Sequence, residues 1–64
     1  MQIVATIRNG HRIVTQDKTY EVYGSLKLRG RYSYLVVDIA TQKKASLSRE
    51  DVLQAQREGS AKVM

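Results

Sequence analysis

Short stretches of alternating apolar and polar residues dominate the first three-quarters of the chain. The stretch 19–28 alternates over its whole length. Period-two alternation of this kind is typical of a strand that buries one of its two faces. The sequence therefore predicts a strand here, with an apolar face that carries Tyr20, Val22, Leu26 and Leu28.

A first hairpin is predicted upstream of this strand. The stretches 2–8 and 11–15 are rich in β-branched residues, and Asn9-Gly10 lies between them. Asn-Gly is a strong signal for a two-residue hairpin turn, because both central positions of a type I′ turn need positive φ. The apolar residues of the two stretches do not share one face. Either the pairing contains a bulge or both faces are partly covered, as in a small barrel.

A second hairpin is predicted to join 19–28 to 31–39 across a two-residue turn at 29–30. In this register Val22 lies opposite Val37, and the apolar faces of the two strands coincide. A slip by one residue would turn every side chain of the second strand to the other face. A three-residue loop is the alternative, because Arg-Gly is a poorer type I′ turn than Asn-Gly.

This register makes a prediction for each face of the hairpin. On the apolar face, Leu35 and Val37 are expected to be buried together with Val22. On the other face, Glu21 lies opposite Asp38, and two like charges in that position destabilise a sheet. An ion pair with a neighbouring cation is the expected relief for these carboxylates.

The last quarter of the chain predicts one short strand and one short helix. After a polar turn at 40–44, the strand covers 45–47 and the helix covers 48–58, with Ser48 as its N-terminal cap. Ser48 is followed by acidic residues, which favour the positive end of a helix dipole. A glycine at position 59 ends the helix. Residues 59–64 are expected to form a flexible tail.

Five short strands with tight turns and a terminal helix predict a mostly β domain over residues 1–64. The order of KTYEVYG (18–24), YSYLVVD (32–38) and SLSREDVL (46–53) resembles SH3-like small β-barrels, including short phage- and plasmid-encoded proteins. This resemblance implies an antiparallel barrel of about five strands. The chain is also similar in size and charge to the archaeal seven-kilodalton chromatin proteins of the same fold. Those proteins place a tryptophan on the DNA-facing sheet, and this chain has no tryptophan, which argues against wedging of a side chain into the minor groove.

The composition excludes several kinds of site. The chain has no cysteine and a single histidine, His11, so it offers neither a disulfide nor the ligand set of a zinc site. We expect His11 to lie at the surface near a turn, without a metal. No apolar run reaches the roughly 18 residues of a transmembrane helix, and no signal-peptide pattern is present. A soluble, cytoplasmic domain without a cofactor is expected.

The positive charge is concentrated in the first three-quarters of the chain. The formal net charge is +5, and residues 1–48 carry all of this excess. An uneven basic surface favours anionic partners through Coulomb attraction. Solubility alone is the alternative explanation, because many small domains carry a net charge of about 2–8.

Catalysis is not expected. His11 has no patterned carboxylate beside it, and Glu50 and Asp51 are explained by the helix start. Gly24 and Gly30 lie in a strand and a turn rather than before a helix, so they do not make a phosphate-binding loop.

The segment 27–34 carries the candidate functional chemistry. Cations and tyrosines alternate there, and cations beside aromatic rings hold single-stranded nucleic acid by phosphate contacts and base stacking. Tyrosine is also an ordinary strand residue. We predict a nucleic-acid interface, most simply for DNA with low sequence specificity. Its predicted residues are Tyr23, Lys27, Arg29, Arg31, Tyr32, Tyr34, Lys43 and Lys44.

The competing interpretation is a protein-interaction module, such as a small regulator or inhibitor. Small barrels dock partners through exposed aromatic residues or edge strands. A chain with a thin core also has reason to form a homodimer that covers 2–8 and 11–15. Binding that weakens steeply with salt favours nucleic acid, and binding that does not favours a protein partner.

Overall fold

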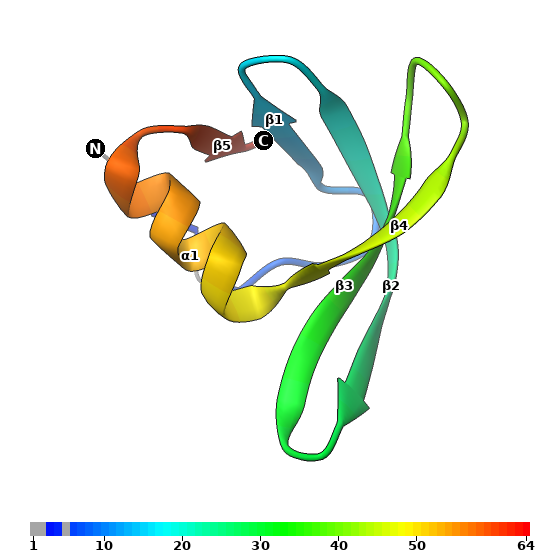
Figure 1. The fold of residues 1–64 in the computed structure, drawn as a ribbon, viewed down its shortest axis with the longest axis vertical. Helices are drawn as coiled ribbons and strands as arrows, with labels where there is room; N and C mark the ends of the chain where they lie inside the picture. Colours follow the sequence, from blue (N-terminus) through cyan, green and yellow to red (C-terminus); the bar gives the residue numbers. More distant parts are fainter. Residues whose placement is uncertain (1–2, 5) are drawn as a thin grey trace.

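The computed structural model describes residues 3–4 and 6–64, and it is mostly β (Figure 1). Its elements are four strands, one helix and a fifth strand, which confirms the prediction that the domain is mostly β. They are β1 (Arg12–Thr15), β2 (Thr19–Leu28), β3 (Arg31–Asp38), β4 (Lys44–Ser48), α1 (Arg49–Glu58) and β5 (Ala61–Val63).

All five strands belong to one antiparallel sheet in the order β4-β3-β2-β1-β5. β4 and β5 are its two edges, and the described strands do not close into a barrel. α1 connects the two edge strands and contacts β3, β4 and β5 (Figure 1). The result is an open, curved sheet with one helix on one of its faces.

The core lies between this helix and the sheet. Its buried apolar side chains are Ile13, Val22, Tyr34, Val36 and Val52. Partly buried residues from the N-terminal segment, from β2 and from the edge strands pack around them, namely Ile7, Tyr20, Leu47, Ala61 and Val63. We call the face of the sheet that carries Val22 and Val36 the inner face, and the opposite one the outer face.

The two-residue turn at 29–30 is confirmed. Leu28 pairs with Arg31 across it. The predicted register holds for the part of the hairpin nearest the turn, up to the pair Gly24–Leu35. Arg29 has a φ of 53° and Gly30 a φ of 78°, as a type I′ turn requires at both central positions. The backbone therefore accepts Arg-Gly here even though arginine disfavours positive φ.

The part of this hairpin farther from the turn differs from the prediction. The register shifts between Val22 and Gly24, so that Val22 pairs with Val36 and not with Val37. This β-bulge gives β2 one extra residue, which moves β3 by one position and reverses its faces relative to β2. The predicted burial of Leu35 and Val37 is wrong in this respect. Both are only half-buried, whereas Val36 and Tyr34 fill the core.

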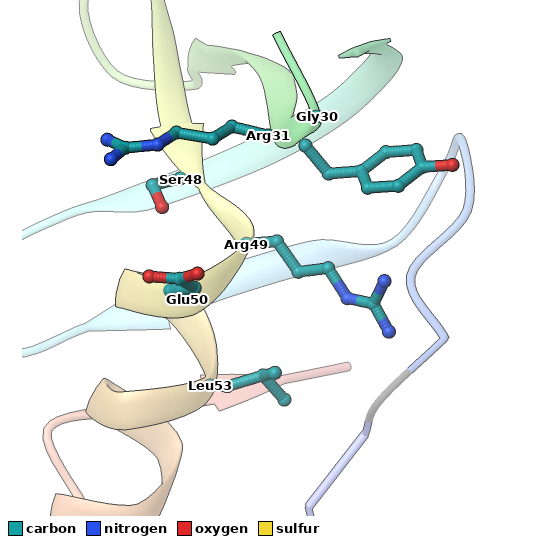
Figure 2. Close-up of a pocket in the computed structure, with 7 residues that line it drawn as sticks. Gly30, Arg31, Ser48, Arg49, Glu50 and Leu53 are labelled. Atoms are coloured by element: carbon teal, nitrogen blue, oxygen red, sulfur yellow. The ribbon is translucent and has the colours of Figure 1, made fainter. Parts of the chain in front are cut away.

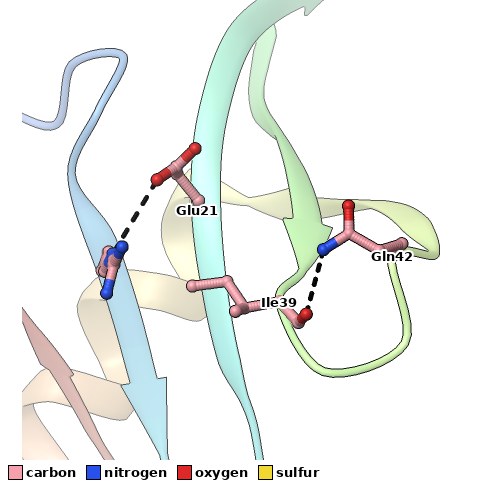
Figure 3. A network of polar contacts seen from close by, with 4 residues as sticks. Glu21, Ile39 and Gln42 are labelled. Atoms are coloured by element: carbon pink, nitrogen blue, oxygen red, sulfur yellow. Dashed lines mark hydrogen bonds and ion pairs between the residues drawn. The ribbon is translucent and has the colours of Figure 1, made fainter.

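The bulge also separates the two acids that the sequence placed opposite each other. Asp38 lies opposite Tyr20, and its Oδ1 accepts a hydrogen bond of 2.9 Å from the Ala40 N–H at the start of the next turn. Glu21 Oε1 lies 3.8 Å from Arg12 Nε, and in the same region Gln42 Nε2 donates a hydrogen bond to the Ile39 carbonyl (Figure 3). The ion pair expected for Glu21 is therefore present.

The described residues of the predicted strand 2–8 do not form a strand. Residues 2 and 5 lie outside the described part of the chain, and residues 3, 4 and 6–8 belong to no strand. β1 already has β2 and β5 as neighbours, so neither side of β1 is left for another strand. The Asn9-Gly10 turn exists, but only Gly10 has positive φ, at 94°. A His11 N–H bond to the Arg8 carbonyl closes it at 3.1 Å, which matches a type II rather than a type I′ turn.

The helix lies where the sequence predicts it, and the segment after it does not. Ser48 is the N-terminal cap residue, although its side chain makes no cap hydrogen bond. Gly59 ends α1 with a φ of 80°, and its N–H bonds back to the Gln56 carbonyl at 3.1 Å. The expected flexible tail 59–64 instead contains β5, which pairs with β1 and so completes the sheet.

Candidate nucleic-acid interface

Tyr32 is the centre of a small cationic cluster in the part of the β2–β3 hairpin nearest its turn. Tyr32 is 44% exposed. Lys27 is its cross-strand partner, with Nζ 5.3 Å from the ring centroid. Arg49, the first residue of α1, places its Cζ 5.8 Å from the same centroid. Cations at this distance from an aromatic ring are attracted by its quadrupole. We call Lys27, Tyr32 and Arg49 the Tyr32 cluster.

Two surface hollows meet at this cluster. The first, of about 440 Å³, lies between the hairpin turn and the start of α1, and Arg31, Glu50 and Leu53 line it together with Tyr32 and Arg49. Figure 2 shows that the Arg49 and Leu53 side chains extend to one side, whereas Arg31 and Glu50 extend to the other. The single carboxylate of this hollow therefore points away from Arg49.

The second hollow, of about 300 Å³, lies between the hairpin and the N-terminal segment. Thr6 and Ile7 line one side of it, and Ser25 and Tyr34 lie on the hairpin side, together with Tyr32 and Arg49. The lining thus combines hydroxyl-bearing side chains with an aromatic ring and a guanidinium. Such a lining offers hydrogen bonds and charge to a polar, anionic ligand.

The cations of the cluster make no ion pairs. Among the residues that the structure describes, the one ion pair joins Arg12 and Glu21. Lys27, Arg29, Arg31 and Arg49 are all exposed. Their charge therefore faces solvent and is available to an anionic ligand.

The structure does not bring the eight predicted interface residues together on one face of the sheet. Cross-strand partners project from the same face, so Lys27 and Tyr32 belong to the inner face with Tyr34 and Val36, whereas Lys44 shares the outer face with Val37. Lys44 Nζ lies 5.6 Å from the centroid of the Tyr23 ring. Tyr23 and Lys44 are therefore a second cation–aromatic pair, on the face opposite to the Tyr32 cluster.

The remaining predicted residues have different positions. Tyr34 is only 6% exposed and belongs to the core, although it also lines the second hollow. Arg29 occupies the hairpin turn, and Arg31 extends away from Arg49 (Figure 2). Lys43 lies in the turn before β4, where its carbonyl accepts the Asp38 N–H at 2.8 Å.

Sequence reasoning missed Arg49. The signal for it is the register of β4 on β3, in which Ser48 pairs with Ser33. Continuing that antiparallel register by one position brings residue 49 beside Tyr32. The approximate prediction of the last strand as 45–47 gave no pairing with β3, so this neighbour could not be named.

Other kinds of site find little support in the described residues. No group of three or more His, Cys, Asp or Glu side chains lies close enough there to hold a metal ion. His11 is partly buried next to the Asn9-Gly10 turn, and its Nδ1 accepts the Arg8 N–H at 3.1 Å. No helix in the described part of the chain has the length and apolar character needed to cross a membrane.

Comparisons with known proteins add no relative to this description. A scan against models of known protein families finds no match, and searches of curated proteins and of solved structures find none either.

Proposed function

We propose that this protein is a non-enzymatic module that binds nucleic acid, DNA in the first place, with low sequence specificity. The observation that carries the proposal is the Tyr32 cluster, in which one exposed ring lies between two cations at the junction of two hollows. Lysine and arginine contact phosphates, and an aromatic ring contacts a base or sugar, so the cluster offers both kinds of contact in one place.

The charge of the hairpin supports the same ligand. Arg29 and Arg31 extend the positive charge beyond the Tyr32 cluster, and residues 27–34 contain no acidic side chain. Each phosphate that a cation neutralises releases counterions, which makes such binding strong at low salt and weak at high salt. Electrostatic binding of this kind depends little on base sequence.

Low sequence specificity follows from what α1 carries. Direct readout of bases commonly uses a helix or a ribbon in the major groove. α1 has Glu50 and Asp51 in its first turn, and these carboxylates would repel the phosphate backbone. The sheet order and the helix between β4 and β5 support the further proposal that the fold is an SH3-like small barrel with an open side.

A salt titration tests the proposal. Fluorescence anisotropy with labelled duplex DNA, single-stranded DNA and RNA at two salt concentrations should show binding that weakens steeply with salt. The double variant Arg29→Ala with Arg31→Ala should reduce the salt slope on duplex DNA by about two units, since each lost phosphate contact removes about 0.9. Lys43→Ala with Lys44→Ala removes the same charge elsewhere and should change the slope by less than half as much. An unchanged slope in the Arg29→Ala, Arg31→Ala variant would show that the hairpin is not the contact.

One observation favours a second candidate, the protein-interaction module. Leu26 and Leu28 are 49% and 64% exposed. They pair with Ser33 and Arg31, so they lie on the outer face of the hairpin, opposite to the Tyr32 cluster. Exposed leucines of this kind serve protein contacts. The absence of nucleic-acid binding at low salt would favour this candidate.

A further inference from the structure

We infer that the Tyr32 cluster takes single-stranded nucleic acid in preference to duplex, with one unpaired base seated beside Tyr32. This inference rests on the proposed function and names its substrate class. It follows from three properties of the site, namely the recess beside the ring, the lining of that recess and the directions in which the cations extend.

The recess is of the right size and position for a single base. Tyr32 and Arg49 line both hollows, so open space adjoins this residue in each of them. The second hollow, of about 300 Å³, falls at the small end of the range of about 300–1,000 Å³ that small-molecule pockets occupy. An unpaired base can enter such a hollow and stack on a ring or a guanidinium plane. The bases of a duplex are stacked inside the double helix and cannot reach it.

The lining of the recess suits the polar edge of a base. Thr6 of the N-terminal segment and Ser25 of β2 are hydroxyl-bearing residues in the lining of the second hollow, and Ile7 is an apolar one. Hydroxyls both donate and accept hydrogen bonds, so they tolerate any of the four bases. The site therefore distinguishes an unpaired base from a paired one without selecting a particular sequence.

The cations are poorly arranged for a duplex. A duplex gains affinity from many cations that face one surface at the same time. Here Arg31 and Arg49 extend in opposite directions (Figure 2), and Lys44 lies on the opposite face of the sheet from Lys27. A single strand is flexible enough to pass around the hairpin and contact cations that point different ways, whereas a stiff duplex contacts only those on one side.

The test compares two ligands of equal length, a labelled 12-nucleotide oligothymidine and the corresponding oligothymidine–oligoadenine duplex, by anisotropy at low salt. The single strand should bind at least about tenfold more tightly than the duplex, which corresponds to one stacked base. Equal or tighter binding of the duplex would overturn the inference and leave the proposed function intact. If neither oligonucleotide binds, the proposed function fails, and the inference fails with it.

Two tyrosine variants locate the contact. Tyr32→Leu should weaken binding of the single strand about tenfold and leave duplex binding nearly unchanged. Tyr23→Leu is the matched control, because Tyr23 is also an exposed strand tyrosine beside a cation, at 41% exposure, but lies on the outer face and lines neither hollow. Equal losses in the two variants would overturn the inference. The thermal midpoint of each variant shows that it is folded, and Tyr32→Phe should bind as the unmodified protein does.

Discussion

The Gln56 side chain holds the backbone of Val4 by two hydrogen bonds. Its Oε1 accepts the Val4 N–H at 2.8 Å, and its Nε2 donates to the Val4 carbonyl at 3.0 Å. Gln56 is only 2% exposed, although its side chain is polar, and with Val52 it is one of the two buried residues of α1. The side-chain amide of Gln56 thus makes the two backbone hydrogen bonds with Val4 that a neighbouring strand would otherwise make. It attaches to α1 the segment that forms one wall of the second hollow.

This pair predicts a large cost for loss of the amide. Gln56→Leu should lower the free energy of unfolding by about 2 kcal/mol, because both polar groups of Val4 lose their partner in a partly buried place. Urea unfolding measures the change. Gln54→Leu is the control, since Gln54 is exposed on the same helix and bonds only to Glu58. Similar changes in the two variants would contradict the role given to Gln56.

The bulge in β2 predicts which valine of β3 supports the core. Val36 is 0% exposed and Val37 is half-buried. Val36→Ala should cost about 2 kcal/mol of stability, as expected for a large-to-small change in a packed core. Val37→Ala should cost less than about 1 kcal/mol. Chemical denaturation measures the loss of unfolding free energy in both variants. A larger loss for Val37→Ala would contradict the bulge and support the pairing of Val22 with Val37.

The hairpin turn predicts a stabilising change at Arg29. Its φ of 53° is unfavourable for arginine and is tolerated better by asparagine. Arg29→Asn should therefore raise the free energy of unfolding by about 0.5 kcal/mol. Arg31→Asn removes the same charge at a position in β3 without positive φ, and it should give no gain. Thermal unfolding of the two variants separates the backbone effect from the charge effect, and equal shifts would contradict it.

β5 predicts that the end of the chain is needed for stability. Val63 packs against the core and pairs with the buried Ile13. Val63→Ser should lower the free energy of unfolding by about 1–2 kcal/mol through lost apolar burial. Lys62→Ser, at the exposed neighbouring position, should change it by no more than about 0.5 kcal/mol. A flexible tail would instead make both substitutions neutral, which calorimetry can distinguish.

Local signals explain the parts of the fold that the sequence predicts. Acidic residues after Ser48 and the glycine at 59 define α1, because cap and dipole effects act within one turn of helix. The two-residue turn at 29–30 also follows from nearby residues. The class of fold follows in turn, since alternating stretches separated by such turns leave little choice other than an antiparallel sheet.

The parts that the sequence does not predict depend on contacts between distant residues. The stretch 2–8 has the composition of a strand, but whether it pairs depends on a free sheet edge, and β5 takes that place on β1. The bulge at Tyr23 brings Val36, and not Val37, into the core beside Val52 of α1. Arg49 joins the candidate site only through the register of β4 on β3. None of these is encoded in a short stretch of residues.

The bulge also divides the hairpin into one part that packs in the core and one part that is exposed to solvent. Val22 and Val36 are held by the core, whereas residues 26–32 are all exposed. Because strand faces repeat every two residues, the part of the hairpin nearest the turn can be lengthened or shortened by two residues on each strand without turning any side chain to the other face. The exposed part of the hairpin can therefore change without changing the pairing of the buried part. Its length and composition are free to diverge with the ligand, and it is the natural position for a grafted recognition loop.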